Sequence, residues 1–293
     1  MAKVVRTRDE IQQRIVKLLN SMDGKYSRWQ IWQDFILMYA TSIANVFPGP
    51  YREEREQSYL EVAAKYGKKE METIAEMMAL TVAGMDANPD QDFLGELYMA
   101  LELGNVWKGQ FFTPYCVCQM MASMTLANDI KDRCEQQGFV SVNDPACGAG
   151  ALLIAFANEC RRKGINFQQQ VLFTAQDIDL LAGMMCYIQL SLMGCPGYVV
   201  IDNTLTKPAL MYDKRGLLPV DKGNVWYTPM YYSDRWQIRQ IAARLDLLTR
   251  FPKKASEEVV KKLEPVMAEI QKAPEPVTVP ELKADETGQL SLF

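Results

Sequence analysis

Three observations predict an α/β fold for this chain of 293 residues. Apolar residues recur at helical spacing through most of residues 1–108. After residue 138, short apolar runs of strand length alternate with helical patterns. Each of the first three runs ends in glycine, acidic or amide residues. Strands that alternate with helices indicate a parallel sheet, so we expect a helical N-terminal region followed by an α/β unit.

The N-terminal region, residues 1–108, is expected to form helices throughout. Its apolar stripes begin at Ile11, become rich in aromatic residues between Trp29 and Ile43, and become rich in methionine within 63–85. The Trp and Met stripes have two interpretations, a binding surface or a buried core. The core is favoured, because this spacing is that of one buried helix face.

The segment Asp144–Gly150 predicts a strand, a tight turn and a helix, because it lies between the apolar run 138–142 and the helical run 151–157. Gly148 and Gly150 let the backbone approach a ligand closely, and the helix start behind them offers free N–H groups. The segment lacks the Lys-Ser/Thr pair of a nucleotide-phosphate loop. Two interpretations remain, a ligand-binding loop and an ordinary turn from strand to helix.

Two further strands are predicted at 171–176 and 197–201, and both end in polar residues. Asp177 follows the first, where a carboxylate can accept hydrogen bonds from two ribose hydroxyls. Asp177 and Asp179 are also both candidates for the cap of a helix over 180–193, and Asp179 is the better one. Asp202 and Asn203 follow the second strand. Ligands of open α/β sheets bind beyond such carboxyl ends, so the pattern predicts one shared crevice.

A second short motif, Gly109-Gln110-Phe111-Phe112-Thr113-Pro114, precedes the glycine-rich segment, and Asp92–Tyr98 precedes both. In this order the three segments resemble the adenine-N6 DNA methyltransferases, especially the modification subunits of type I restriction systems. The resemblance extends from about Asp92 to Leu205, and its two core motifs are highly specific.

The resemblance implies a Rossmann-like class I methyltransferase domain that binds S-adenosylmethionine (SAM) and acts on the exocyclic amine of adenine in DNA. It also implies the residues that hold the cofactor. Phe111, Phe112 and Thr113 would cover the methionine end; Asp144, Ala146, Gly148 and Gly150 would hold the amino-acid moiety; Asp177 would bind the ribose, and Asp202 or Asn203 the adenine ring. The other interpretation of Phe111 and Phe112 is simple core packing.

The chain departs from the family at the catalytic motif, which usually reads Asn/Asp/Ser-Pro-Pro-Tyr/Phe after a fourth strand. That place holds Asn224–Tyr231, in which Thr228, Pro229 and Tyr231 are the candidate catalytic residues. A hydroxyl accepts a hydrogen bond less well than a carboxamide, and losing one positioned acceptor costs about 3 kcal/mol of transition-state stabilisation. The alternative is therefore an inactive pseudo-methyltransferase that serves as a SAM-binding or replication-associated interaction module.

The end of the chain predicts an abbreviated sheet. Helical patterns cover 236–251 and 253–271, and no further strand is evident. The expected divisions are a helical region at 1–108, a methyltransferase-like domain at 109–251, a helix at 252–271 and a disordered tail at 272–293. There is no room for a separate target-recognition domain, so sequence-specific DNA reading would come from loops or from a second subunit.

The tail is rich in Pro, Glu, Lys and Thr, a composition typical of an extended tether. Its last residues, Gln289, Leu290, Ser291, Leu292 and Phe293, are similar to the bacterial sliding-clamp-binding motif. That motif offers one glutamine and three apolar anchors to a preformed pocket. The alternative is an apolar tail without a partner. Tethering to a clamp would raise the local concentration of DNA around the protein.

The amino-acid composition excludes several kinds of catalytic and metal site. The chain has no histidine, which excludes His-based triads and His-ligated metals, and its seven cysteines lack paired spacing, so no metal site is expected. No membrane-length apolar run or signal pattern is present, so the cytoplasm is expected. The net charge of −4 disfavours strong autonomous DNA binding. Local cations near the crevice are candidate DNA contacts or ordinary solvated residues: Arg161, Arg162, Lys163, Lys207, Lys214, Arg215, Arg235 and Arg239.

Overall fold

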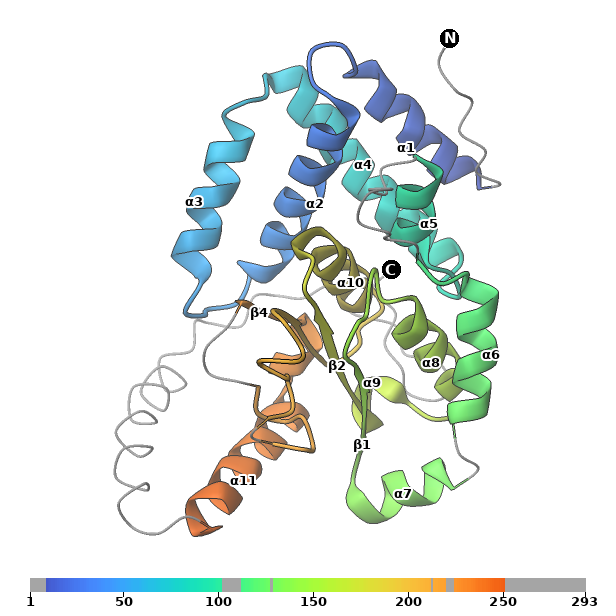
Figure 1. The fold of residues 1–293 in the computed structure, drawn as a ribbon, viewed down its shortest axis with the longest axis vertical. Coiled ribbons are helices and arrows are strands. Elements are labelled where there is room, and N and C mark those ends of the chain that lie inside the picture. The colour runs from blue at the N-terminus through green and yellow to red at the C-terminus, as the bar shows by residue number, and fades with distance from the viewer. Residues whose placement is uncertain (1–8, 102–111, 127–128, 212, 220–223, 251–293) are drawn as a thin grey trace.

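The computed structural model describes residues 9–101, 112–126, 129–211, 213–219 and 224–250 (Figure 1). The predicted C-terminal helix at 252–271 and the predicted disordered tail at 272–293 lie outside these ranges, as does Phe111. The expected divisions of the chain therefore stay predictions at its C-terminal end.

The N-terminal region is helical, as its periodicity predicts. It contains α1 (Glu10–Ser21), α2 (Arg28–Ala44), α3 (Arg52–Ala63), α4 (Lys68–Ala87) and α5 (Phe93–Ala100). Short polar side chains start three of these helices, because their oxygens accept hydrogen bonds from otherwise unpaired first-turn N–H groups. Asp9 caps α1, Ser27 caps α2 and Asp92 caps α5.

The sheet has four strands in the part of the chain that the structure describes: β1 (Val140–Asp144), β2 (Val171–Asp177), β3 (Gly197–Ile201) and β4 (Asn224–Tyr227). They lie side by side in chain order. β1, β2 and β3 are parallel, whereas β4 pairs with β3 in the antiparallel direction. The fold is thus mixed α/β with a small sheet, as the sequence predicts. The reversed direction of β4 decides where the residues after it lie.

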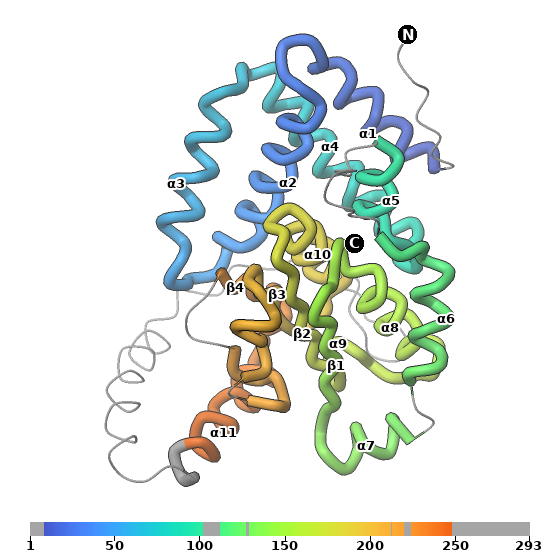
Figure 2. Tube along the Cα trace, in the orientation of Figure 1, coloured from blue at the N-terminus to red at the C-terminus, as the bar shows by residue number. Residues whose placement is uncertain are grey.

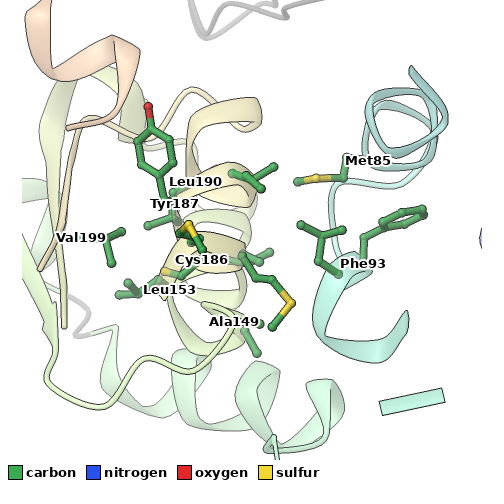
Figure 3. Packing of buried hydrophobic residues seen from close by; sticks show 14 of the residues in the cluster. Met85, Phe93, Ala149, Leu153, Cys186, Tyr187, Leu190 and Val199 are labelled. Atoms are coloured by element: carbon green, nitrogen blue, oxygen red, sulfur yellow. The ribbon is translucent and has the colours of Figure 1, made fainter. Parts of the chain in front are cut away.

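Helices surround the parallel strands. α6 (Tyr115–Thr125) packs along α8 (Ala151–Arg162), while α7 (Ile130–Gln137) and α9 (Phe167–Gln170) lead into β1 and β2. α10 (Leu180–Leu192) is the central helix, and all its residues from Leu181 to Ser191 are buried. Figure 3 shows why: Tyr187, Cys186 and Leu190 of this helix lie between Val199 of the sheet and Phe93 and Met85 of the N-terminal helices. A helix that is apolar on all sides is one that is covered on all sides.

The remaining elements are a 3-10 helix, η2 (Pro229–Tyr232), and α11 (Asp234–Arg250). They contribute to a second, smaller buried cluster with residues of β2, β3 and β4: Leu172, Tyr198, Val200, Val225, Tyr231 and Trp236 are among its members. The main cluster extends without interruption from α1 through the sheet to α10. In Figure 2, α2 and α4 lie above α10, and both helices contact it. The N-terminal helices and the sheet therefore share one core.

Candidate functional site

Three acidic residues gather at the carboxyl edge of the parallel strands. Asp144 ends β1, Asp177 ends β2 and Asp202 follows β3. The register places Asp177 beside Ile201, and the Asp202 amide donates to the Asp177 carbonyl at 3.1 Å. The ends of the three strands therefore lie together at one edge of the sheet, whereas the ligand crevice stays a prediction. The edge carries three carboxylates on neighbouring strands.

The Asp177 carboxylate is bonded to the glycine-rich loop. Its Oδ2 accepts from the Gly148 amide at 2.8 Å, and its Oδ1 accepts from the Asp179 amide at 2.9 Å. Asp179 caps α10 instead, because its Oδ1 accepts from the Ala182 amide at 3.0 Å. The two aspartates thus have different roles. Asp177 is half-buried, and each of its oxygens has a second lone pair for a further donor.

The loop after β1 needs its glycines. Gly148 and Gly150 have φ angles of +53° and +97°, a left-handed region that side chains disfavour. A Cβ on Gly150 would lie 2.9 Å from the Cys186 sulfur. The Asp144 Oδ1 accepts from the Ala146 amide at 3.1 Å, which closes the turn. Burial raises the pKa of the Asp144 carboxyl above its ordinary value.

The helix behind this loop starts without a side-chain cap. Gly150 occupies the cap position of α8, and no side chain accepts a hydrogen bond from the first turn. Uncapped N–H groups and the positive end of the helix dipole attract a carboxylate or phosphate. The loop and the helix start together therefore suit the anionic end of a ligand, beside a row of acidic groups that suits its cationic or hydroxyl groups.

The second motif reaches the same loop. The Phe112 ring is half-buried, and a Cβ on Gly148 would lie 3.1 Å from it. The ring also lies 5.4 Å from the Tyr98 ring, centroid to centroid, and packs against the main core. Thr113 follows as an exposed residue just before α6. Phe112 thus packs on the core, as one interpretation of the sequence holds, and it borders the glycine-rich loop. Its contact with a cofactor stays a prediction.

The loop after β3 is held by polar contacts. Asp202 forms an ion pair with Lys207 at 2.7 Å, and this hydrogen bond lowers the pKa of the Asp202 carboxyl. Asn203 uses its Oδ1 to accept from the Leu205 amide at 2.9 Å. The Thr204 hydroxyl donates to the Pro145 carbonyl at 2.6 Å, which ties this loop to the loop after β1. The two outer loops therefore meet across the end of β2.

Sequence reasoning missed two buried glutamines that support this edge. Gln176 is 1% exposed; its Nε2 donates to the carbonyls of Asp202 and Lys207, and its Oε1 accepts from the Ala209 amide. Gln189 is fully buried and donates to Asp92 and to the Ala149 carbonyl. The sequence does contain a sign of these two roles, since each glutamine lies within an otherwise apolar strand or helix. A buried amide side chain requires hydrogen-bond partners.

The candidate catalytic residues lie at the opposite edge of the sheet. Because β4 is antiparallel to β3, its last residue, Tyr227, pairs with Tyr198 near the start of β3. The Thr228 amide donates to the Gly197 carbonyl at 3.0 Å. Thr228 is fully buried, and its hydroxyl donates to the Cys195 carbonyl and accepts from the Gly197 amide. Backbone groups at the start of β3 and just before it thus occupy the Thr228 hydroxyl.

Tyr231 is also part of the interior. It is 5% exposed, its hydroxyl donates to the Leu217 carbonyl at 2.7 Å, and its ring stacks on Tyr227 with centroids 5.1 Å apart. Pro229 opens the 3-10 helix that carries it. The structure thus places Thr228, Pro229 and Tyr231 at the end of the sheet opposite the candidate cofactor residues, because β4 is antiparallel to β3. Their catalytic roles stay a prediction from the sequence.

Most of the predicted cationic DNA contacts have partners within the protein. Arg162 pairs with Asp90 and Glu159, and Arg215 with Asp213 and Asp246. Arg239 lies over the rings of Phe139 and Trp236 and donates to two carbonyls. These side chains stabilise the fold.

Six of the seven cysteines are buried free thiols. No helix in the described ranges has the length and apolar character needed to cross a membrane.

Two comparisons with known proteins gave different results. The comparison with curated proteins found no match. The family model of the N-6 DNA methylases matches residues 90–257, which is more than half of the chain. The match includes the α5 segment, both motifs, and all four strands of the sheet. The chain therefore belongs to the N-6 DNA methylase family and is a DNA adenine methyltransferase-like protein.

Proposed function

We propose that this chain binds SAM at the carboxyl edge of its sheet and methylates the exocyclic amine of adenine in DNA. The observation that carries the proposal is the 2.8 Å hydrogen bond between the Gly148 amide and the Asp177 carboxylate. It sets Asp177, the acid proposed to bind the ribose, directly beside the backbone of a glycine-rich loop. An acid at the end of the second strand and a glycine-rich loop after the first strand are together typical of a nucleoside cofactor site, whereas either one alone is not.

The donor set fits SAM. This cofactor has a carboxylate, an ammonium, a sulfonium, two ribose hydroxyls and an adenine ring. The start of α8 suits the carboxylate, because its first turn has no side-chain cap. The acidic residues at the strand ends suit the cations and the hydroxyls. A site with only positive or only negative groups would leave either the ammonium and sulfonium or the carboxylate of SAM without a partner.

The residue assignments are those that the family resemblance implies. In the proposal, Phe112 and Thr113, with Phe111 before them, cover the methionine end. Asp144, Ala146, Gly148 and Gly150 hold the amino-acid moiety, Asp177 binds the ribose hydroxyls, and Asp202 and Asn203 lie at the adenine ring. The bound cofactor supplies an electrophilic methyl group for the adenine nitrogen. We assign no catalytic acceptor to Thr228, because its hydroxyl is already bonded on both sides.

Calorimetry tests the cofactor site. Wild-type protein should release heat with SAM and with its demethylated product. Asp177→Ala should weaken binding by about 2–3 kcal/mol, because two charge-assisted acceptor positions are lost. Asp132→Ala, an exposed carboxylate on α7, is the matched control and should bind normally. Absence of heat with folded wild-type protein would refute the proposal.

Methyl transfer is measured separately. Tritiated cofactor should label adenine in duplex or single-stranded DNA, and digestion to nucleosides should place the label on N6-methyladenine. A protein that binds the cofactor but labels no DNA of any sequence would be a methyl-donor-binding interaction module instead. Each measurement thus decides one half of the proposal.

The partners proposed from the sequence rest on the sequence alone. Gln289, Leu290, Leu292 and Phe293 lie outside the described residues, and we propose that they bind a sliding clamp. Double replacement of Leu290 and Phe293 by alanine should abolish clamp capture without a change in melting temperature, because the sequence predicts a tether before the motif. A fall in melting temperature would show that the pentapeptide packs on its own domain. A second subunit that reads the DNA sequence is proposed on the same basis.

A further inference from the structure

The helix α11 has apolar residues on two opposite faces. Its inner face packs on the smaller core cluster, where Trp236 and Ala243 are buried. Its outer face carries Ile238, Ile241 and Leu245, which are 66%, 45% and 58% exposed. These three residues, the outer stripe, are spaced by three and then four positions, so they form one row along the helix.

The outer stripe has nothing to pack on within the described ranges. α11 lies at the periphery of the fold (Figure 1), and all three side chains of the stripe stay exposed there. Single exposed apolar residues are ordinary, but a continuous row on a helix is typical of a surface that another element covers. A helix needs one apolar face to pack on a core, so a second face indicates a second partner.

The sequence just beyond α11 contains a segment that matches the stripe. Pro252 follows the end of the helix at Arg250, in a position where proline prevents the helix from continuing. The segment 253–271 then has a helical pattern of its own. Its apolar residues Leu263, Val266 and Ile270 repeat the spacing of the outer stripe, three positions and then four. Two rows with this spacing can pack along each other as neighbouring helices.

The two rows oppose each other in one register. Opposed positions of an antiparallel helix pair lie equally far before and after the turn. With a turn centred at residues 253 and 254, three apolar pairs form together: Leu245 with Leu263, Ile241 with Val266, and Ile238 with Ile270.

Pro265 lies within the segment but on the side away from its apolar row, at 3.6 residues per turn. Its ring therefore stays outside the interface. A proline ring presses on the preceding turn at its own side and bends the helix away from that side, which here is toward α11.

We propose that the segment 253–271 folds back as a helix and covers the outer stripe of α11. The segment is favoured over a second copy of the chain because a few residues attach it to α11, which gives it an effective concentration in the millimolar range. The pairing brings Ile270 beside Ile238, so the tail from residue 272 leaves the fold at the start of α11. The other end of this helix is about 25 Å away, at 1.5 Å per residue. The inference depends neither on SAM binding nor on a clamp.

Cysteine cross-linking in the full chain tests the pairing. Ile241→Cys is combined with Val266→Cys in a Cys116→Ser background, which removes the exposed thiol of the described residues. Mild oxidation should close a disulfide within one chain, because opposed positions of neighbouring helices suit its geometry. Mass spectrometry of the peptides locates the bond. The matched control combines Ile241→Cys with Ala268→Cys, on the opposite side of the segment, and should form its bond about tenfold more slowly.

Equal rates for the two cysteine pairs would show a segment that reaches α11 without docking and would overturn the inference. Absence of the 241–266 bond would overturn it as well. Disulfide-linked dimers on a non-reducing gel would assign the outer stripe to a second copy instead.

Thermal unfolding of the full chain is a second, independent measurement. Val266→Asp should lower the melting temperature by about 5 °C, because it places a charge in an apolar interface. Ala268→Asp adds the same charge on the opposite side and should lower the melting temperature by at most about 2 °C, the effect of a weaker helix former. The same melting temperature for both variants would contradict the proposed pairing.

Discussion

Asp92 and Gln189 lie 97 residues apart in the chain and share a buried hydrogen bond of 2.8 Å. The same Gln189 nitrogen donates to the Ala149 carbonyl at 2.8 Å, and its oxygen accepts from the Leu94 amide at 3.1 Å. One side chain therefore joins α5, α10 and the glycine-rich loop. The N-terminal helices are bonded to the glycine-rich loop through it.

Replacing Gln189 with leucine should destabilise the protein by about 3 kcal/mol. The change leaves the Leu94 amide and the Ala149 carbonyl without their side-chain partner, and each buried unpaired group costs about 1–3 kcal/mol. Urea denaturation measures the loss. Gln57→Leu is the control, because Gln57 is exposed and bonds only Glu61 nearby; its effect should stay within about 0.5 kcal/mol. Equal effects of the two changes would contradict the connecting role of Gln189.

Asp92→Asn should alter the dependence of stability on pH. Burial raises the pKa of the Asp92 carboxyl above its ordinary value of 3.8. Its protonated form therefore stabilises the fold fully below the unfolded pKa, and this contribution is lost as the pH rises through the folded pKa. Asparagine keeps the oxygen that accepts from Gly95 and Gln189 without taking a charge.

The unfolding free energy of Asp92→Asn should therefore increase relative to wild type as the pH rises from about 4 to 8. The gain should be about 1.4 kcal/mol for each unit by which folding raises the pKa. Denaturation curves at several pH values provide the comparison. Parallel profiles of the two proteins over this range would show that Asp92 has the same affinity for a proton in both states.

Gly150→Ala should destabilise the glycine-rich loop by more than its backbone conformation explains. Gly24 has a similar φ of +100° but no atom within 4 Å of an added Cβ, so Gly24→Ala measures the conformational cost, about 1–2 kcal/mol. At Gly150 the new carbon also meets the Cys186 sulfur at 2.9 Å. In a Cys186→Ala background, the effect of Gly150→Ala should therefore decrease. An unchanged effect in this double-mutant cycle would rule out the contact.

Thr228→Val should cost about 1–3 kcal/mol of stability, because it removes the acceptor of the buried Gly197 amide while nearly preserving shape. Thr228→Ser retains the hydroxyl and should cost less. Thr228→Asn, which the methyltransferase motif would suggest as an improvement, should destabilise instead, since the side chain is fully enclosed. Thermal unfolding and methyl transfer are measured on all three variants. A more active, stable asparagine variant would restore the catalytic role.

Local sequence was sufficient to predict the secondary-structure elements at the carboxyl edge of the sheet. Alternation of strands and helices predicted β1 to β3, and the glycines of Asp144–Gly150 predicted a turn that only positive φ angles allow. Asp179 was the better predicted cap of α10, and it caps that helix. These features depend on neighbours along the chain, so composition and spacing are enough to predict them. They cover the loops in which we place SAM.

Tertiary structure alone decided the features that depend on distant residues. The four residues of β4 have no local feature that sets their direction, because a strand can pair with β3 in either orientation. Its antiparallel pairing moved Thr228 and Tyr231 to the opposite edge and into the core. Likewise, the partners of Gln189 and the rings around Arg55 come from elements far apart in sequence. Such contacts form only when packing brings the elements together, which spacing along the chain does not encode.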